Sequence, residues 1–202
     1  MEPNFKEPVT RVDILNYIIE HFNYRSYLEI GVQGKYCWNQ IKCDDKTGVE
    51  PVGVMNDDRI YSTTSDGFFK DNVKTFDCIF IDGDHNESQV TRDIDNALKF
   101  VNHKGMIVLH DAYPPSEEFT VPLRCGTVYR AIWNARNKHN IGIATYTGDF
   151  GVAVIRKKYN EGLISIPVNN YRSYIDNSSK IINSIDYFED FKSQLSILFS
   201  DD

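Results

Sequence analysis

The spacing of apolar positions along the chain predicts alternating helices and strands. Residues 76–81, interrupted only by Asp77, and residues 106–109 form apolar runs, which are typical of parallel strands covered on both faces. Residues 87–101, between these runs, carry apolar side chains at helical spacing, so the three segments predict a βαβ unit and hence an α/β fold. Further short strands are predicted at residues 27–30, 48–52 and 60–63.

Both ends of the chain add elements to this centre. Residues 9–22 place apolar side chains at helical spacing, which predicts a leading helix that docks on the sheet. After a helix predicted at 127–137, residues 141–146 and 151–155 predict a hairpin, so the sheet is expected to end antiparallel. From Tyr159 onward the chain is rich in Asn, Ser and Asp, and only residues 185–199 show an amphipathic pattern.

The composition is that of one globular domain. The chain has 202 residues, of which 41% are hydrophobic and 25% are charged, which is enough to bury a core without disulfides or a structural metal. We expect residues 1–157 to form the main body with its leading helix, and residues 158–202 to form a helical appendage of the same domain. The four cysteines include no C-x-x-C pair and are expected to be reduced and mostly buried.

Charge and hydropathy argue against two classes of partner. The formal net charge is -7 and no run of lysines and arginines offsets it, so the electrostatic footprint of a nucleic-acid-binding protein is missing. Residues 1–10 lack the apolar core of a signal peptide, and no apolar run approaches membrane-spanning length. The sequence therefore predicts a cytoplasmic protein that binds neither nucleic acid nor a membrane.

A glycine turn follows the first predicted strand. Glu29 lies inside this strand, and Gly31 and Gly34 come directly after it, where the backbone can turn tightly and let a ligand approach. Glu50 lies at the end of the next predicted strand, where Rossmann-like folds place a carboxylate that binds both ribose hydroxyls. The alternative interpretations are an ordinary tight turn and an exposed acid at a strand end.

Polar residues follow both long apolar runs. Asp82, Asp84 and His85 come after the first run, and His110 and Asp111 come after the second. Ligands bind at the carboxyl ends of neighbouring parallel strands, so one shared site is expected. Its oxygen and imidazole ligands suit Mg²⁺ or Mn²⁺, and such an ion would hold and acidify a substrate hydroxyl.

Roles without a metal are also open for these residues. His85 or His110 is a candidate general base, because the ordinary pKa of histidine, roughly 6.5, suits proton removal near neutrality. In the alternative interpretation, Asp82 or His85 only contacts a cofactor, Asp84 caps the following helix, and His110 is a hydrogen-bonded histidine near the core.

Five sequence blocks follow one another along the chain: Tyr27 to Gly34, Gly48 to Pro51, Thr64 to Phe69, Phe80 to His85 and Ile107 to Asp111. In this order they resemble class I S-adenosylmethionine-dependent methyltransferases of a small subgroup similar to methyltransferase family 24. The resemblance spans roughly residues 25–156 and implies a Rossmann-like sandwich, with a mostly parallel seven-stranded sheet whose last strand is antiparallel.

The resemblance also implies roles for individual residues. The methionine end of S-adenosylmethionine would be lined by Glu29, Gly31, Val32 and Gly34. Glu50 would hold the ribose, Ser65 and Asp66 would lie near the adenine, and Asp82 would also contact the cofactor. Metal-dependent O-methyltransferases bind their ion at positions that match Asp82, His110 and Asp111, and the catalytic candidates are Asp82, His85 and His110.

The function expected from this resemblance is O-methylation of a small molecule or sugar, assisted by a divalent metal if the cluster at Asp82, His110 and Asp111 binds one. A non-catalytic protein that binds S-adenosylmethionine or another nucleoside is one alternative. A metal-dependent phosphohydrolase is another, suggested by His85, His110 and Asp111, although its usual scaffold is all helical. A nicotinamide-dependent oxidoreductase is disfavoured by the incomplete G-x-G-x-x-G. Arg124 and Arg130 are interpreted as solvated charges, with binding of an anionic acceptor as the alternative.

Overall fold

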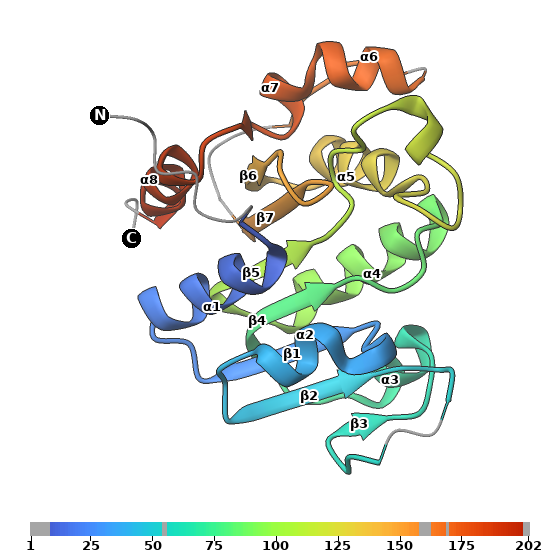
Figure 1. Ribbon diagram of the computed structural model, residues 1–202, viewed down its shortest axis with the longest axis vertical. Helices are drawn as coiled ribbons and strands as arrows, with labels where there is room; N and C mark the ends of the chain where they lie inside the picture. The colour runs from blue at the N-terminus through green and yellow to red at the C-terminus, as the bar shows by residue number, and fades with distance from the viewer. Residues whose placement is uncertain (1–8, 54–55, 158–162, 169, 200–202) are drawn as a thin grey trace.

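A mixed sheet forms the centre of the protein in the computed structural model (Figure 1), which describes residues 9–53, 56–157, 163–168 and 170–199. Within these residues the sheet has eight strands in the order β3-β2-β1-β4-β5-β7-β6-β8. All neighbouring strands are parallel except β7, which runs antiparallel to β5 and β6. The strands are β1 (Ser26–Ile30), β2 (Asp45–Val49), β3 (Ile60–Tyr61), β4 (Phe76–Ile81), β5 (Val101–Leu109), β6 (Ile141–Tyr146), β7 (Val152–Lys157) and β8 (Ser184–Ile185).

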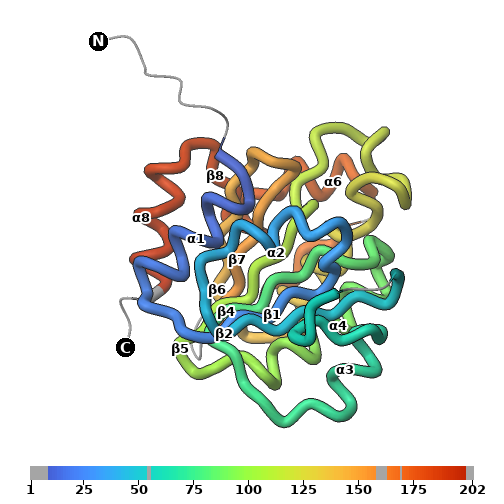
Figure 2. Tube along the Cα trace, turned by 60° about the horizontal axis from the view of Figure 1, so that its bottom comes forward, coloured from blue at the N-terminus to red at the C-terminus, as the bar shows by residue number. Residues whose placement is uncertain are grey.

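Helices cover both faces of this sheet, as Figure 2 shows for α1 and α2 on one side and α3 and α4 on the other. The helices are α1 (Arg11–His21), α2 (Tyr36–Gln40), α3 (Ser65–Asp71), α4 (Glu87–Phe100), α5 (Val128–Lys138), α6 (Tyr171–Asp176), α7 (Ser178–Ile181) and α8 (Phe188–Phe199), with short 3₁₀ turns η1 (Gln33–Lys35) and η2 (Glu117–Phe119). Among the described residues, no helix combines the length and apolar character needed to cross a bilayer.

Alternation along the central strands divides the core between the two faces. Ile79 and Ile81 of β4 belong to the cluster packed against α3, α4 and α5, whereas Cys78 and Phe80 belong to the cluster packed against α1, α2 and α8. Successive side chains of a strand point to opposite faces, so a strand buried on both faces must be apolar throughout. This is why residues 78–81 of β4 form a continuous apolar run.

The central strands end level with one another, which fixes the position of the site. Ile30 of β1 pairs with Ile81 of β4, and Ile81 pairs with Leu109 of β5. The next residue of each strand, Gly31, Asp82 and His110, therefore lies at the same edge of the sheet. Ligands of open α/β sheets bind at this carboxyl edge.

The predicted mostly parallel sheet with an antiparallel strand is confirmed, and β8 extends it beyond seven strands. The leading helix, the βαβ unit and the β6–β7 hairpin are also confirmed. The all-helical scaffold expected for the phosphohydrolase alternative is contradicted by this sheet.

Two predictions of local structure were wrong. The strand predicted at 48–52 begins earlier and ends at Val49, because Pro51 has no N–H to continue the ladder, while the polar start of β2 hid its beginning from the apolar pattern. The C-terminal part contains α6 and α7 as well as the expected helix. Asn170 starts α6 through a capping box with Ser173, a signal that does not depend on apolar periodicity.

The C-terminal segment packs on the main body. β8 pairs with β6, and Phe191 and Leu195 of α8 share an apolar cluster with Leu15 of α1. The predicted boundary between the main body (1–157) and the appendage (158–202) borders residues 158–162, which lie outside the described residues.

Candidate functional site

Two adjoining cavities lie at the carboxyl edge of the sheet. One, of about 370 Å³, is lined by Glu50, Ser65 and Asp93 and is called here the Glu50 cavity. The other, of about 670 Å³, is lined by His85, His110 and Asp111 and is called the His85 cavity. Gly31, Gln33, Asp82, Gly83 and Asp84 line both. A ligand in one cavity can therefore reach a ligand in the other past the turn after β1.

Gly31 allows the backbone segments after β1 and β4 to meet at this boundary. Its φ is +90°, and a Cβ added there would lie 2.2 Å from the carbonyl oxygen of Asp82. A side chain cannot fit at that distance, so the close approach of the two segments requires glycine. The predicted glycine turn is thus present where a ligand would approach.

Glu50 is buried directly after β2, with 5% of its surface exposed. One carboxylate oxygen accepts a hydrogen bond from the backbone N–H of Gln33 and the other accepts one from the N–H of Val52, each at 2.9 Å. Each oxygen of an ionised carboxylate retains further acceptor capacity. The carboxylate is therefore held in a fixed orientation and can accept hydrogen bonds from a vicinal diol.

A polar network that the sequence did not indicate closes the other end of the Glu50 cavity. The side-chain amide of Gln89 donates to the hydroxyl of Ser65 and to the carboxylate of Asp93, both at 3.0 Å. Burial raises the pKa of Asp93 to about 6, although hydrogen bonds from Ser65 and Gln89 oppose the rise. Gln89 and Asp93 lie one turn apart on α4. The only sign of this network in the sequence was that Asp93 stands next to the apolar positions of the helix.

Of the predicted cofactor residues, Gly31, Glu50, Ser65 and Asp82 line the Glu50 cavity. The other four, Glu29, Val32, Gly34 and Asp66, are not among its lining residues.

Glu29 is turned toward the opposite face of the sheet. Strand alternation puts it on the side of Tyr27, whose hydroxyl donates to its carboxylate at 2.8 Å. Burial raises the pKa of Glu29 to about 7 against the lowering effect of the Tyr27 hydrogen bond. Val32 packs with Trp38 and Ile60, and Asp66 forms an exposed ion pair with Arg92 at 3.2 Å.

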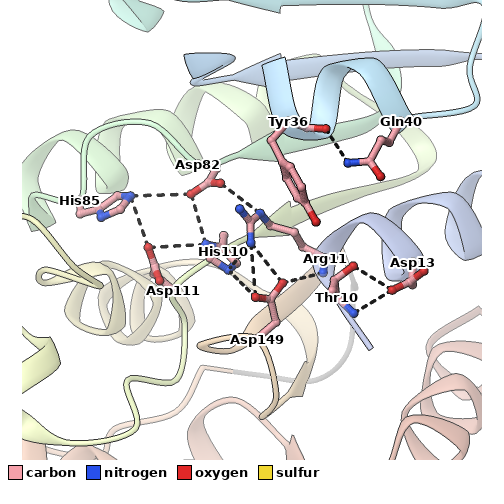
Figure 3. A network of polar contacts seen from close by, with 10 residues as sticks. All are labelled: Thr10, Arg11, Asp13, Tyr36, Gln40, Asp82, His85, His110, Asp111 and Asp149. Carbon is pink, nitrogen blue, oxygen red and sulfur yellow. Dashed lines mark hydrogen bonds and ion pairs between the residues drawn. The ribbon is translucent and has the colours of Figure 1, made fainter. Parts of the chain in front are cut away.

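Asp82, His85 and Asp111 meet on the floor of the His85 cavity (Figure 3). Each offers a possible ligand atom, and these atoms lie within 4.8 Å of one another. His85 Nε2 is 3.3 Å from Asp111 Oδ2 and 3.7 Å from Asp82 Oδ1. Two carboxylates and an imidazole are a donor set that suits Mg²⁺, Mn²⁺ or a related ion.

His110 lies beside this triad and is 7% exposed. Its Nδ1 is 3.3 Å from Asp82 Oδ1 and 3.5 Å from Asp111 Oδ2. The predicted metal ligands Asp82, His110 and Asp111 are therefore together, and His85 joins them. The structure brings all three catalytic candidates, Asp82, His85 and His110, into one cluster.

Arg11 and Asp149, which the sequence did not indicate, complete the cluster from distant parts of the chain (Figure 3). Arg11 Nε forms an ion pair with Asp82 Oδ2 at 3.5 Å, and its Nη1 lies 3.2 Å from Asp149 Oδ2. Asp149 also accepts from the backbone N–H of Arg11 at 2.7 Å and lies 3.6 Å from His110 Nε2. The start of α1 and the β6–β7 turn are thereby tied to the ends of β4 and β5.

Contacts within the cluster raise the pKa of both histidines and lower the pKa of Asp82. Burial works against a charged His110, but hydrogen bonds with Asp111, Asp149 and Asp82 outweigh it and raise the pKa of His110 to about 11. Burial likewise opposes ionisation of Asp82, yet hydrogen bonds from His110 and His85 keep its pKa well below the usual range. A protonated His110 has no lone pair to accept a proton near neutral pH.

The sheet order and the antiparallel strand β7 are those of the Rossmann-like methyltransferase fold. Residues 28–112 match the family model described as "Methyltransferase domain". The fold of the chain is that of the class I S-adenosylmethionine-dependent methyltransferases. No protein in the set of curated sequences matches the chain.

Solved structures with the same fold have little sequence identity to the chain. The SAH-bound methyltransferase PaMTH1 of Podospora anserina is 16% identical, with 74% of this chain and 78% of that chain covered and a TM-score of 0.58. The O-methyltransferase of Bacillus cereus in complex with SAH is 16% identical over 77% and 84%, with a TM-score of 0.55. TomG of Streptomyces achromogenes, an O-methyltransferase of tomaymycin synthesis in complex with SAM, is 14% identical over 78% and 83%, with a TM-score of 0.55.

Proposed function

We propose that this methyltransferase transfers the methyl group of S-adenosylmethionine to a hydroxyl oxygen of a small molecule or sugar, assisted by a divalent cation. The observation that carries the proposal is the junction of the two cavities at Gly31 and Asp82. The cofactor would occupy the Glu50 cavity and the acceptor the His85 cavity. The O-methyltransferase activity of the relatives from Bacillus cereus and Streptomyces achromogenes supports an oxygen acceptor.

The Glu50 cavity has the groups that a nucleoside requires. In this proposal, Glu50 accepts hydrogen bonds from the two ribose hydroxyls, and Ser65, with Gln89 and Asp93 behind it, faces the adenine. Gly31 leaves room for the methionine end beside Asp82. Glu29, Val32 and Gly34 would then support the turn after β1 rather than touch the cofactor, and Asp66 would influence the adenine end from outside the cavity.

The reaction at the junction is a displacement at carbon. The acceptor oxygen attacks the methyl carbon, the carbon–sulfur bond breaks with its electron pair going to sulfur, and the hydroxyl proton passes to a base. Holding the two reactants in line supplies much of the rate enhancement. His110 is held as a cation between Asp82, Asp111 and Asp149, and His85 is a ligand in the proposed cation site, so the proton would pass to solvent.

The cluster of Asp82, His85 and Asp111 fits a divalent cation by its donor atoms and their spacing. When bound, Mg²⁺ or Mn²⁺ supplies a positive charge that lowers the pKa of an acceptor hydroxyl. His110 and Arg11 would orient the carboxylates from the other side, since both contact Asp82.

The experiment is methyl transfer from labelled S-adenosylmethionine to a panel of hydroxyl compounds, with Mg²⁺, with Mn²⁺ and with a chelator. We expect transfer in metal and its loss in chelator, and Asp111→Asn should abolish the metal-dependent part while binding S-adenosylhomocysteine normally. Asp71→Asn is the matched control, because Asp71 is an exposed acid at the end of α3 and lines neither cavity. Full transfer in chelator would refute the metal, and binding without any transfer would favour the non-catalytic alternative.

A further inference from the structure

One wall of the His85 cavity is built from two phenylalanines and an arginine, which we call the aromatic wall. Phe119 and Phe150 are stacked, with ring centroids 5.7 Å apart and planes inclined by 29°. The guanidinium of Arg124 lies 4.3 Å above the ring of Phe119. Phe150 in turn meets His110 edge-on at 6.2 Å, so the wall runs from the mouth of the cavity to the polar cluster.

The position of Phe150 is held by the backbone at a conformational cost. Asp149 and Phe150 have φ angles of +47° and +60°, in the left-handed region that side chains rarely adopt. Two backbone hydrogen bonds hold this turn, from Tyr113 N–H to the Phe150 carbonyl at 2.8 Å and from Ala112 N–H to the Gly151 carbonyl at 3.0 Å. The result is a phenyl ring that lines the cavity while 43% of its surface stays exposed. Strain of this kind is found where function requires a particular side-chain position.

Arg124 brings a positive charge to the wall. Within the described residues, no carboxylate forms an ion pair with its guanidinium, whereas Arg11, the other arginine of this cavity, is paired with Asp82 and Asp149. The backbone carbonyl of Arg124 bonds to His85 Nδ1, which anchors this loop to the polar cluster. The guanidinium is thus oriented by Phe119 and available to a ligand.

Apolar surface continues beyond Arg124 at the mouth of the cavity. Leu123 is 99% exposed and Pro122 beside it also lines the cavity. Exposed apolar side chains that rim a concave site are typical of ligand-binding surfaces. A bound molecule with an apolar body would cover them.

We propose that the acceptor is a planar ring compound that carries an anionic group, an inference that rests on the proposed function. Its ring would lie along Phe119 and Phe150, its carboxylate or phosphate would pair with Arg124, and its hydroxyl would reach Asp82, His85 and Asp111. Offset stacking favours a planar ring on phenylalanine, and a guanidinium binds carboxylate or phosphate oxygens through two parallel donors.

The test compares matched ligands that differ only in charge. Protein saturated with S-adenosylhomocysteine is titrated calorimetrically with 4-hydroxybenzoate and 4-hydroxycinnamate, and with the neutral amide of each. A chelator is present so that the carboxylates cannot bind through a metal. We expect at least one carboxylate to bind about three- to tenfold more tightly than its amide, the range for a partly exposed charged pair.

Variants of the aromatic wall separate the contribution of the Arg124 charge to ligand binding from that of the phenyl rings. Arg124→Gln should remove the preference for carboxylate over amide, and Arg124→Lys should restore part of it. Phe150→Leu should weaken carboxylate and amide alike. Arg130→Gln is the matched control, because Arg130 lies over the ring of Tyr129 at 5.7 Å in the same kind of contact but does not line the cavity.

The outcomes distinguish this inference from the proposed function. Equal affinity for carboxylate and amide, or a preference that survives Arg124→Gln, would overturn the inference, as would the absence of all binding in protein that holds S-adenosylhomocysteine. Failure of the folded wild-type protein to bind S-adenosylhomocysteine would instead contradict the proposed function itself.

Discussion

At the scale of single residues, two glycines of the same turn make different demands. Gly31 and Gly34 both have positive φ, but a Cβ at Gly31 would meet the Asp82 backbone at 2.2 Å, whereas nothing lies within 4 Å of one at Gly34. The backbone conformation is thus common to both positions, and the steric conflict is confined to Gly31.

The pair gives a direct prediction. Gly34→Ala should lower the free energy of unfolding by about 1–2 kcal/mol, the cost of a left-handed alanine, and leave affinity for S-adenosylhomocysteine nearly unchanged. Gly31→Ala should cost more and should also weaken that affinity, because the turn must move away from Asp82. Urea unfolding and calorimetric titration measure both effects. Equal losses in the two variants would show that the close approach to Asp82 is unimportant.

Asp93 is the residue whose burial predicts a pH dependence. Its pKa is raised to about 6, above the ordinary value of about 4, so the folded protein favours the protonated form. Its contribution to stability is therefore complete below about pH 4 and is lost as the pH rises through about 6.

Asp93→Asn should consequently stabilise the protein at pH 7.5, by on the order of 1–3 kcal/mol, and this gain should vanish near pH 4. Urea unfolding of the wild type and of Asp93→Asn at both pH values measures the difference in their free energies of unfolding. Other titrating groups contribute equally to the two proteins and cancel in this difference. Asp71→Asn, at an exposed acid ending α3, is the control and should show no such dependence. A gain that is the same at both pH values would contradict a buried carboxyl at position 93.

The sequence located the site residues that belong to local motifs and missed those that come from elsewhere. Gly31, Glu50 and Asp82 follow strands and were predicted from that position. Arg11 and Asp149 lie 138 positions apart and meet only because α1 and the β6–β7 turn cover the same edge of the sheet. For Glu29 the motif predicted too much. It implied contact with the cofactor, whereas strand alternation buries the side chain beside Tyr27 on the other face of the sheet.

At the scale of elements, α8 joins the chain end to its beginning. Phe191 and Leu195 are fully buried in the cluster that includes residues of α1, and Lys192 lies over the ring of Tyr17. Figure 2 shows α1 and α8 side by side on the same face of the sheet. The packing of α8 therefore supports the helix that carries Arg11.

Leu195→Ala should lower the free energy of unfolding by about 2–5 kcal/mol, the range for a leucine truncated inside a core. Ile197→Ala on the same helix should cost less than about 1 kcal/mol, because 53% of that side chain is exposed. Chemical denaturation of the two variants measures the contrast. Similar small effects would mean that α8 is only loosely attached to the sheet.

Elements were predictable where a single periodicity dominates. The buried strands β4 and β5 and the amphipathic helix α4 satisfy that condition, so their sequence determines them almost alone. The strand β2 begins with Asp45 and Lys46, and α6 begins at the Asn170 cap, so neither start has an apolar signature. The left-handed residues at 149 and 150 could not be foreseen, because their conformation is imposed by the contact with Ala112 and Tyr113.

At the scale of the whole molecule, the fold gathers the candidate site from segments spread across the described chain. The ends of β1, β2, β4 and β5 supply Gly31, Glu50, Asp82 and His110, while α1 and the β6–β7 turn close the cluster through Arg11 and Asp149. The ordered sequence motifs predicted this architecture, since each follows a strand of the sheet. On the acceptor side, the sequence offered only Arg124, as an alternative to a solvated charge. Phe119 and Phe150 were not predictable, because their positions depend on tertiary contacts.

The central claim is that the Glu50 cavity binds S-adenosylmethionine through the ribose, and calorimetric titration with S-adenosylhomocysteine tests it most directly. We predict that the wild-type protein binds and that Glu50→Gln loses about 1–3 kcal/mol of binding free energy, as expected for a charged hydrogen-bond acceptor, while its circular dichroism spectrum stays that of the folded protein. Asp58→Asn, at an exposed acid between β2 and β3, should bind as the wild type does. Unchanged affinity in folded Glu50→Gln protein would contradict the account.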